Sequence, residues 1–165
     1  MSLKLVVFDV DGCMTNGDIS YDSNGNEIKT FNVKDGLGIV TLHKMDIKTA
    51  IITGRNSQIV ANRVKELGIT YIYQGVKKKI EKLNEIIHKE GLKYSEVAYI
   101  GDDINDVPVL SVVGYSFAPS DALPYAKDAA KVVLHKSGGK GAVREMIEIL
   151  LRECDLKERF VSHWV

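Results

Sequence analysis

The chain has 165 residues, of which 45% are hydrophobic and 27% are charged, values typical of a folded globular protein rather than a disordered or fibrous one. Its 22 basic and 22 acidic side chains cancel, so the composition gives no electrostatic footprint for nucleic acid or an anionic membrane, although a small anionic substrate is compatible with it. Because no apolar run approaches the roughly 18 residues of a membrane span and no apolar leader opens the chain, we expect one cytoplasmic domain over residues 1–165.

Short apolar runs alternate with amphipathic segments along most of the chain. The runs expected to form buried strands are Leu5–Phe8, Thr49–Ile52, Tyr71–Tyr73, Val97–Ile100 and Tyr115–Ala118. Apolar residues at three- and four-residue spacing predict helices at Gly36–Met45, Ser57–Leu67 and Lys78–Glu90. Because strands that alternate with helices of this length are joined by right-handed crossovers, the pattern predicts an α/β fold, a three-layer, Rossmann-like parallel sheet flanked by helices.

Two segments depart from this alternation. In residues 18–33, the runs Ile19–Tyr21 and Glu27–Phe31 flank the turn-rich cluster Asp22–Asn26, which predicts a β-hairpin insertion. The hairpin is too small to form a second domain. Residues 152–165 are typical of a frayed helix end followed by a tail, and the pattern assigns no role to Phe160 or Trp164.

Two carboxylates directly follow the first expected strand. Asp9 and Asp11 stand in the motif Asp9-Val10-Asp11-Gly12, at the strand end where open α/β sheets bind their ligands. Gly12 gives the chain the freedom to turn there. A carboxylate such as Asp9 can attack phosphorus to form an aspartyl-phosphate, and Asp11 can protonate the leaving oxygen. The alternative is a turn whose acidic side chains are merely solvated.

Polar residues also follow the second strand and open the third helix. Thr53, in Thr53-Gly54-Arg55, can hold a phosphoryl oxygen with its hydroxyl and the nearby N–H groups, or the segment can serve only as a helix cap. The lysines of Lys77-Lys78-Lys79 oppose the helix dipole, so we expect one of them, Lys79 before Lys77, to have a partner elsewhere. A solvated helix face is the alternative for this run.

A cluster of acids follows the fourth strand in Gly101-Asp102-Asp103-Ile104-Asn105-Asp106. Three carboxylates in one segment repel one another unless a cation lies among them, and hard oxygen ligands without a nearby histidine or thiolate suit Mg²⁺. Asp102 is the expected direct ligand. Asp103 and Asp106 can ligate through water, orient Lys79, or cap the helix that starts here.

These four motifs, in this order, closely resemble those of the haloacid dehalogenase superfamily of phosphotransferases, and the likeness spans residues 4–118. The resemblance implies that Asp9 is the nucleophile and that Asp11 is first a general acid and then a general base. It implies that Thr53 and Lys79 contact the phosphoryl oxygens, and that Asp102 binds Mg²⁺ beside Asp9 and the main-chain carbonyl of Asp11. The gaps between the motifs are too short for a cap domain, so the chain resembles the capless branch.

Within that branch, four further segments look like those of the 3-deoxy-D-manno-octulosonate 8-phosphate phosphatases. The segments are Asp11–Thr15, Phe31–Gly36, Ile52–Arg55 and Gly138–Glu145. This resemblance implies a Mg²⁺-dependent phosphatase of lipopolysaccharide precursor synthesis and a homotetramer in which hairpins pack together and one subunit's tail reaches a neighbour's site. Related phosphatases of nine-carbon sugar-acid phosphates are the alternative.

A sugar-acid phosphate carries a carboxylate far from its phosphate, so a cationic side chain is needed away from the metal. Lys34, Arg55 and Arg63 are the candidates for binding that carboxylate, and Arg55 offers a two-point guanidinium fork. Arg63 lies eight residues beyond Arg55, about two helical turns, which favours the same side, and a surface residue that packs its stem is the alternative. Two other classes of protein compete with a phosphatase. A receiver-type phosphoacceptor domain needs no acid two residues after its acceptor, whereas Asp11 stands there, and a catalytically silent binding module would tolerate loss of residues such as Asp9.

Overall fold

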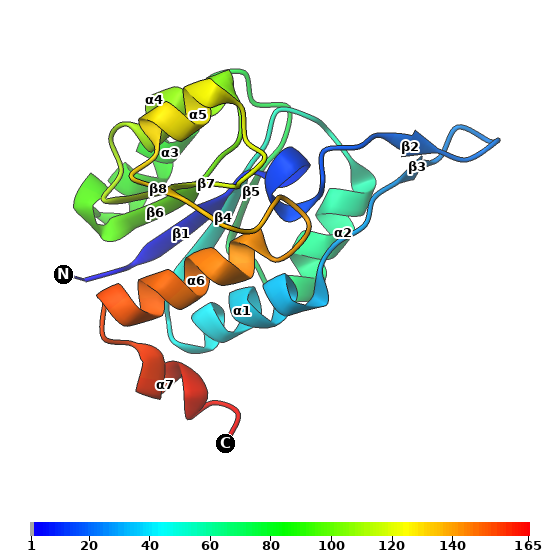
Figure 1. Cartoon of the computed structure of the whole chain (residues 1–165). Coiled ribbons are helices and arrows are strands. Elements are labelled where there is room, and N and C mark those ends of the chain that lie inside the picture. Colours follow the sequence, from blue (N-terminus) through cyan, green and yellow to red (C-terminus); the bar gives the residue numbers. More distant parts are fainter. Residues whose placement is uncertain (1) are drawn as a thin grey trace.

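The computed structural model describes residues 2–165 and contains one parallel six-stranded sheet (Figure 1). Its strands are β1 (Leu5–Phe8), β4 (Lys48–Ile52), β5 (Tyr71–Tyr73), β6 (Val97–Ile100), β7 (Tyr115–Ala118) and β8 (Val132–Val133). Their order is β5-β4-β1-β6-β7-β8, so the chain runs outward from β1 first to one side and then to the other. The carboxyl end of β1 is therefore a topological switch point, where ligand sites form in such sheets.

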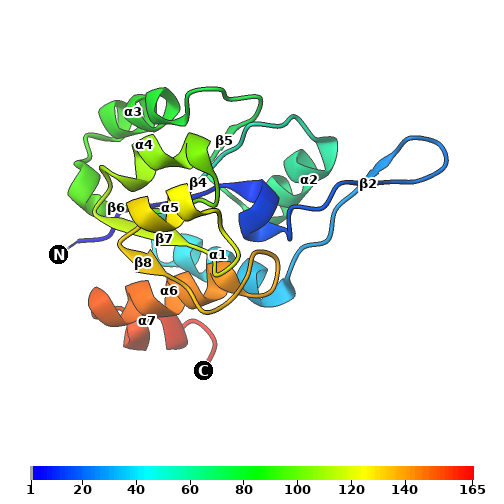
Figure 2. The same cartoon turned by 45° about the horizontal axis from the view of Figure 1, so that its top comes forward.

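Helices cover both faces of the sheet, which gives the expected three layers (Figures 1 and 2). The helices are α1 (Val33–Lys44), α2 (Gln58–Leu67), α3 (Lys79–Glu90), α4 (Val107–Leu110), α5 (Pro124–Ala129), α6 (Ala142–Glu153) and α7 (Lys157–Val161). Short helical turns are η1 (Val10–Met14), η2 (Tyr94–Glu96) and η3 (Ile104–Asp106).

The alternation of side chains along the strands divides the core into two clusters. On β1, Val6 and Phe8 join the cluster under α1, α2, α6 and α7, whereas Leu5 and Val7 join the cluster under α3, α4 and α5. All four side chains are fully buried, as a central strand covered on both faces requires. The burial of β1 fixes the backbone from which the next residue, Asp9, projects.

Local capping explains where the first helices begin and end. The Asn32 side chain accepts a hydrogen bond from the Lys34 N–H at 2.9 Å, so α1 begins three residues earlier than the Gly36 start that the apolar spacing predicts. Ser57 caps α2, and Gly68 ends it in the left-handed conformation with φ of 68°. The expected α2 and α3 are confirmed to within a residue.

The predicted hairpin consists of β2 (Ser20–Tyr21) and β3 (Glu27–Ile28), which pair antiparallel and project from the body of the molecule (Figures 1 and 2). Asp22 closes its turn, because its Oδ1 accepts hydrogen bonds from the N–H groups of Asn24 and Asn26 at 2.8 and 2.9 Å. Within residues 2–165 this hairpin is the insertion between β1 and α1, and no separate cap domain is present.

The carboxyl-terminal segment differs from the expected frayed end and tail, because α6 ends at Glu153 and the chain then forms the separate short helix α7. Phe160 in α7 is buried in the cluster that α1 and α6 share. The Trp164 indole Nε1 donates a hydrogen bond to Thr41 Oγ1 at 2.9 Å, and the Lys44 ammonium lies 4.0 Å from its ring centroid. None of the helices in residues 2–165 combines the length and the apolar run that a membrane crossing needs.

Candidate active site

The carboxyl ends of β1, β4 and β6 open into one pocket of about 270 Å³. Phe8 pairs with Ile51 and with Ile100 across the sheet, so the residues that follow these three strands emerge at the same edge. The pocket is lined by Asp9, Asp11, Gly17, Thr53, Gly54, Arg55, Lys79, Asp102, Asp103 and Asn105. One site therefore gathers residues from all four motifs.

Lys79 lies buried between two carboxylates. Its Nζ is 3.0 Å from Asp9 Oδ1 and 2.6 Å from Asp106 Oδ1, and all three side chains are almost completely shielded from solvent. Burial opposes the charged form of Lys79, but the charges of Asp9 and Asp106 together outweigh it and raise the pKa of Lys79 above its usual value. The ammonium is therefore fixed beside Asp9, and Lys77 and Lys78 remain exposed.

Asp106 organises the loop after β6. It accepts hydrogen bonds from the N–H groups of Asp102 and Asp103 at 2.9 and 3.1 Å, and from the buried Tyr99 hydroxyl. A Cβ on Gly101 would lie 2.5 Å from the Asp106 Cβ, so only glycine fits there. Of the three alternatives for Asp106, the geometry therefore favours orienting Lys79. Asp103 caps the following turn through the Ile104 N–H at 2.6 Å, and it also borders the pocket.

The buried carboxylate of Asp9 and the half-buried carboxylate of Asp102 face each other beside this lysine. Carboxylate oxygens of Asp9 and Asp102 and the Cys13 sulfur lie within 4.8 Å of one another. Burial raises the pKa of Asp9 to about 6, despite the opposing charge of Lys79. Burial and then the neighbouring Asp9 charge raise the pKa of Asp102 to about 8. Such a pair of acids fits a divalent cation, whose positive charge would offset the repulsion between the two ionised carboxylates.

The chemistry of this donor set favours a hard cation such as Mg²⁺. Cys13 is a near neighbour that the sequence pattern did not reveal, but burial and the charges of Asp9 and Asp102 raise the pKa of its thiol well above the usual value. A protonated thiol is a poor metal ligand, so carboxylate oxygens remain. Gly12, with φ of +87°, makes room for them, since a Cβ there would lie 2.0 Å from Asp102 Oδ2.

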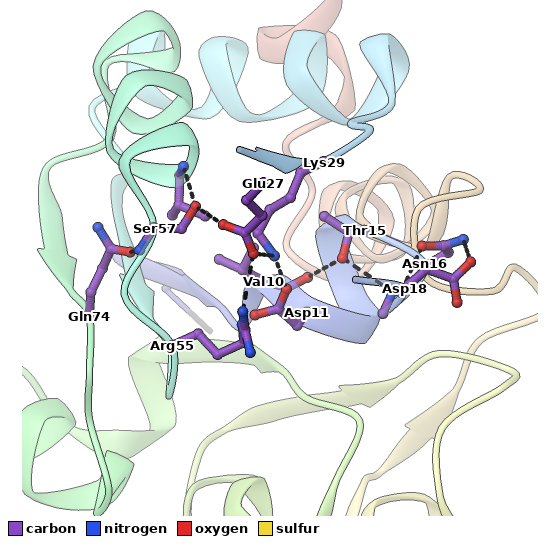
Figure 3. Close-up of polar contacts among 12 residues, drawn as sticks. Val10, Asp11, Thr15, Asn16, Asp18, Glu27, Lys29, Arg55, Ser57 and Gln74 are labelled. Atoms are coloured by element: carbon purple, nitrogen blue, oxygen red, sulfur yellow. Dashed lines mark hydrogen bonds and ion pairs between the residues drawn. The ribbon is translucent and has the colours of Figure 1, made fainter. Parts of the chain in front are cut away.

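Thr53 and Asp11 complete the pocket wall. The backbone of Thr53 is held on both sides, because its N–H donates to Tyr73 O at 2.9 Å and its carbonyl accepts from the Val76 N–H at 3.0 Å. Asp11 forms an ion pair with the Lys29 ammonium from the hairpin (Figure 3). Lys29 was missed by sequence reasoning, because a lysine in a short hairpin gives no local signal of a distant partner.

The three cations expected to bind substrate do not converge. Arg55 borders the pocket and lies 3.2 Å from Glu27, whereas Arg63 and Lys34 lie in two other depressions of the surface. The spacing of eight residues does not carry Arg63 to the side of Arg55. Its guanidinium packs against α1, where a Cβ on Gly36 would lie 2.5 Å from Nη2, and it pairs with Glu66 at 2.9 Å.

Comparison with known proteins identifies the family. The sequence model of the haloacid dehalogenase-like hydrolases matches residues 37–114. The chain is 42% identical over 151 residues to the 3-deoxy-D-manno-octulosonate 8-phosphate phosphatase of Haemophilus influenzae, which covers 92% of this chain and 84% of that protein. The chain belongs to the haloacid dehalogenase-like hydrolases. The Escherichia coli K12 phosphatase of the same name is 43% identical to this hydrolase over 150 residues, 91% of this chain and 80% of the other.

A solved structure extends this likeness to the whole fold of the hydrolase. The crystal structure of 3-deoxy-D-manno-octulosonate 8-phosphate phosphatase from Moraxella catarrhalis, in complex with magnesium ion, phosphate ion and KDO, superimposes with a TM-score of 0.94. It is 38% identical, and the match covers 99% of this chain and 94% of that chain. These relatives are phosphatases, so the receiver-type interpretation is not supported.

Proposed function

We propose that this hydrolase is a Mg²⁺-dependent phosphatase that converts 3-deoxy-D-manno-octulosonate 8-phosphate to the free sugar acid and phosphate. The observation that carries the proposal is the position of Asp9, which is buried at the end of β1 with the Lys79 ammonium 3.0 Å away and the Asp102 carboxylate beside it. The relatives named for this activity share about two-fifths of the sequence over nine-tenths of the chain, which supports the same substrate class.

In this proposal, catalysis proceeds through two displacements at phosphorus. Asp11 takes up a proton from solvent before the reaction; an oxygen of Asp9 then attacks the phosphate ester, and Asp11 gives that proton to the departing sugar oxygen. Asp11, now a carboxylate, takes a proton from the water that attacks the aspartyl-phosphate, which releases phosphate and restores Asp9. Thr53 and Lys79 contact the phosphoryl oxygens throughout, where negative charge is spread in the transition state.

The proposed metal site consists of Asp9, Asp102 and the main-chain carbonyl of Asp11, with Asp103 and Asp106 orienting the loop around it. A Mg²⁺ ion bound there supplies the positive charge that allows an anionic carboxylate to approach an anionic ester. Chelation is therefore expected to abolish phosphate release, and added Mg²⁺ to restore it. Activity that persists undiminished in chelator would contradict the Asp102 assignment.

For the carboxylate end of the substrate we propose Arg55 alone. It is the candidate cation that borders the Asp9 pocket, and its side chain is 42% exposed, so its guanidinium is open to a ligand. Lys34 and Arg63 are not part of the proposal, because they lie outside this pocket.

The experiment that tests the substrate is a phosphate-release assay with Mg²⁺ across three sets of compounds. These are octulosonate 8-phosphate, nonulosonate 9-phosphates and hexose phosphates. We expect the highest kcat/KM for octulosonate 8-phosphate. A higher value for a nine-carbon acid would replace the proposed substrate by the related one, and an equal value for all would leave only a general phosphatase.

The same proposal includes a homotetramer and a role in lipopolysaccharide precursor synthesis in the cytoplasm. The structural support for the tetramer is the projecting hairpin, where Tyr21 is exposed on one face and Ile28 on the other, because the strand register pairs Tyr21 with Glu27 and Ile28 with Ser20. Removing exposed apolar side chains from water is the main driving force of most protein association. A capless pocket is open to water, and a neighbouring subunit would help to close it.

A further inference from the structure

The base of the hairpin carries a network of charged side chains that reaches the candidate active site (Figure 3). Lys29 forms an ion pair with Asp11, and its Nζ is also 3.3 Å from Glu27 Oε1. The Lys29 side chain is only 1% exposed, whereas Asp11, at 22%, still borders the pocket. A lysine with a buried side chain thus lies directly behind an acid that borders the pocket.

Glu27 is itself fixed from the opposite side. Its Oε2 accepts a hydrogen bond from Ser57 Oγ at 2.8 Å, and its Oε1 lies 3.2 Å from Arg55 Nη2. Ser57 caps α2, so the network ties the hairpin to a helix of the body as well as to the pocket. Figure 3 shows Glu27 and Lys29 pointing from the hairpin toward Arg55 and Asp11. The position of the Lys29 ammonium is therefore determined by more than one partner.

The arrangement is not explained by stability alone. Burying two charges costs several kcal/mol of desolvation per ion, so a buried ion pair is weak grounds for a stabilising role. Within residues 2–165, the only hydrogen bond that the Asp11 carboxylate makes is the one from Lys29. Asp11 also lies next to Gly12, whose φ of +87° places it in a conformation that few other residues adopt. The direction of the Asp11 side chain thus depends on Lys29.

From these contacts we propose that Lys29 is a positioning residue for Asp11, and that Glu27 holds Lys29 in place. The inference rests on the proposed function, because it requires that Asp11 transfers protons. When Asp11 gives its proton to the departing oxygen, the carboxylate that forms already faces an ammonium. Lys29 keeps its own proton throughout and touches neither the substrate nor the phosphorylated Asp9.

The test is a double-mutant cycle of Lys29→Met and Asp11→Asn. Methionine keeps an unbranched side chain and removes the charge. General acid–base catalysis contributes about 10² to 10⁴ in rate, so we expect Lys29→Met to lower kcat by about 10-fold or more with little change in KM. If Lys29 acts through Asp11, adding Lys29→Met to Asp11→Asn lowers kcat no further. Losses that multiply in the double variant would overturn the proposal, as would a Lys29→Met enzyme with wild-type kcat.

The leaving group gives a second readout that a merely structural role would not move. The p-nitrophenolate ion is a stable anion and departs without a proton, whereas a sugar alkoxide has to be protonated as it departs. We therefore expect the rate of Asp9 phosphorylation in Lys29→Met to fall more for octulosonate 8-phosphate than for p-nitrophenyl phosphate. Equal losses for both substrates would contradict the proposal.

Controls separate this inference from misfolding and from a wrong substrate. Lys48→Met removes a lysine that pairs with Glu90 on the surface and should leave kcat unchanged. If Lys29→Met does not fold, the same cycle is run with Glu27→Gln, for which we expect a smaller loss that Asp11→Asn also masks. If the wild-type enzyme hydrolyses p-nitrophenyl phosphate but not octulosonate 8-phosphate, the proposed substrate is wrong. The double-mutant cycle can then still be measured with p-nitrophenyl phosphate.

Discussion

Asp9 stands between an ammonium and a second carboxylate, and these neighbours determine what its substitution should do. Asparagine has the same shape but a weakly nucleophilic amide, so we expect Asp9→Asn to lower phosphate release to below about 10⁻³ of wild type. Lys79 keeps its other partner, Asp106, and the fold should survive. The measurements are phosphate release and thermal unfolding.

The matched control for this variant is Asp155→Asn. Asp155 is exposed and has φ of 55°, a conformation that asparagine tolerates, so both activity and melting temperature should match wild type. Normal turnover by Asp9→Asn would exclude the covalent mechanism.

Gly12 offers a test of the metal site that does not alter any ligand. In Gly12→Ala, the new methyl group would lie 2.0 Å from Asp102 Oδ2, so the carboxylate has to move. We expect Mg²⁺ affinity, measured by titration calorimetry, to fall by about 10- to 100-fold, as when groups around a metal site are displaced. Gly25→Ala is the control, because Gly25 has a similar φ of +81° but nothing within 4 Å of its Cβ position. Equal Mg²⁺ affinity in the two variants would show that Asp102 is not a ligand.

The residues that the sequence predicts best are those that directly follow buried strands. Asp9 and Thr53 could be located because an apolar run fixes where a strand ends, and parallel strands bring their carboxyl ends to one edge. Lys29 could not, because it lies 18 positions from Asp11 along the chain and no local pattern predicts that the hairpin brings the two together. For Arg63 the sequence predicts a position beside Arg55, but its guanidinium packs against α1. Helical spacing indicates the side of α2 on which Arg63 lies and not the neighbour that it contacts.

At the scale of elements, Asp35 links α1 to α6. Its Oδ1 accepts a hydrogen bond from the Arg144 N–H at 2.8 Å, in the first turn of α6, while Oδ2 is buried and has no hydrogen-bond partner among the residues that the structure describes. Burial outweighs that bond and raises the pKa of Asp35 to about 6 from 3.8. The folded protein therefore binds this proton more tightly than the unfolded chain does, so the contribution of Asp35 to stability decreases as pH rises from about 4 to 6.

The Asp35→Asn variant tests this dependence of stability on pH, because asparagine cannot ionise. The free energy of unfolding of wild type, measured relative to the variant by denaturant titration, should fall by up to about 3 kcal/mol between pH 4 and pH 7. The difference isolates Asp35 from the other titrating groups, which both proteins share. A difference that is constant with pH would mean that Asp35 is solvated in the folded state.

Elements were predictable where the apolar pattern was long and poorly predictable where it was short. β8 has only two residues, too few to show a period, and it was not expected. The five residues of α7 are also too few to give a clear helical pattern, so the sequence predicts a frayed end there. The helix forms because Phe160 is buried in the core cluster beside α6, and such a tertiary contact outweighs weak local propensity.

At the scale of the whole molecule, the hairpin is the element that extends farthest from the sheet (Figures 1 and 2). Its base contacts the pocket through Lys29, while its outer strands expose apolar side chains. Assembly through the hairpin would therefore stabilise the same segment that fixes Asp11. This arrangement links the proposed oligomer to the chemistry of the site.

We expect the wild-type protein to have four times the chain mass by light scattering coupled to size exclusion. In the variant Tyr21→Ser/Ile28→Ser, two side chains that are 59% and 51% exposed become polar, so the proposed tetramer should dissociate and kcat/KM should fall. Tyr125→Ser, on α5, removes an equally exposed tyrosine away from the hairpin and should leave the mass unchanged. If the hairpin variant keeps the wild-type mass, the subunits associate through another surface, whereas a wild-type monomer would remove the tetramer from the proposal.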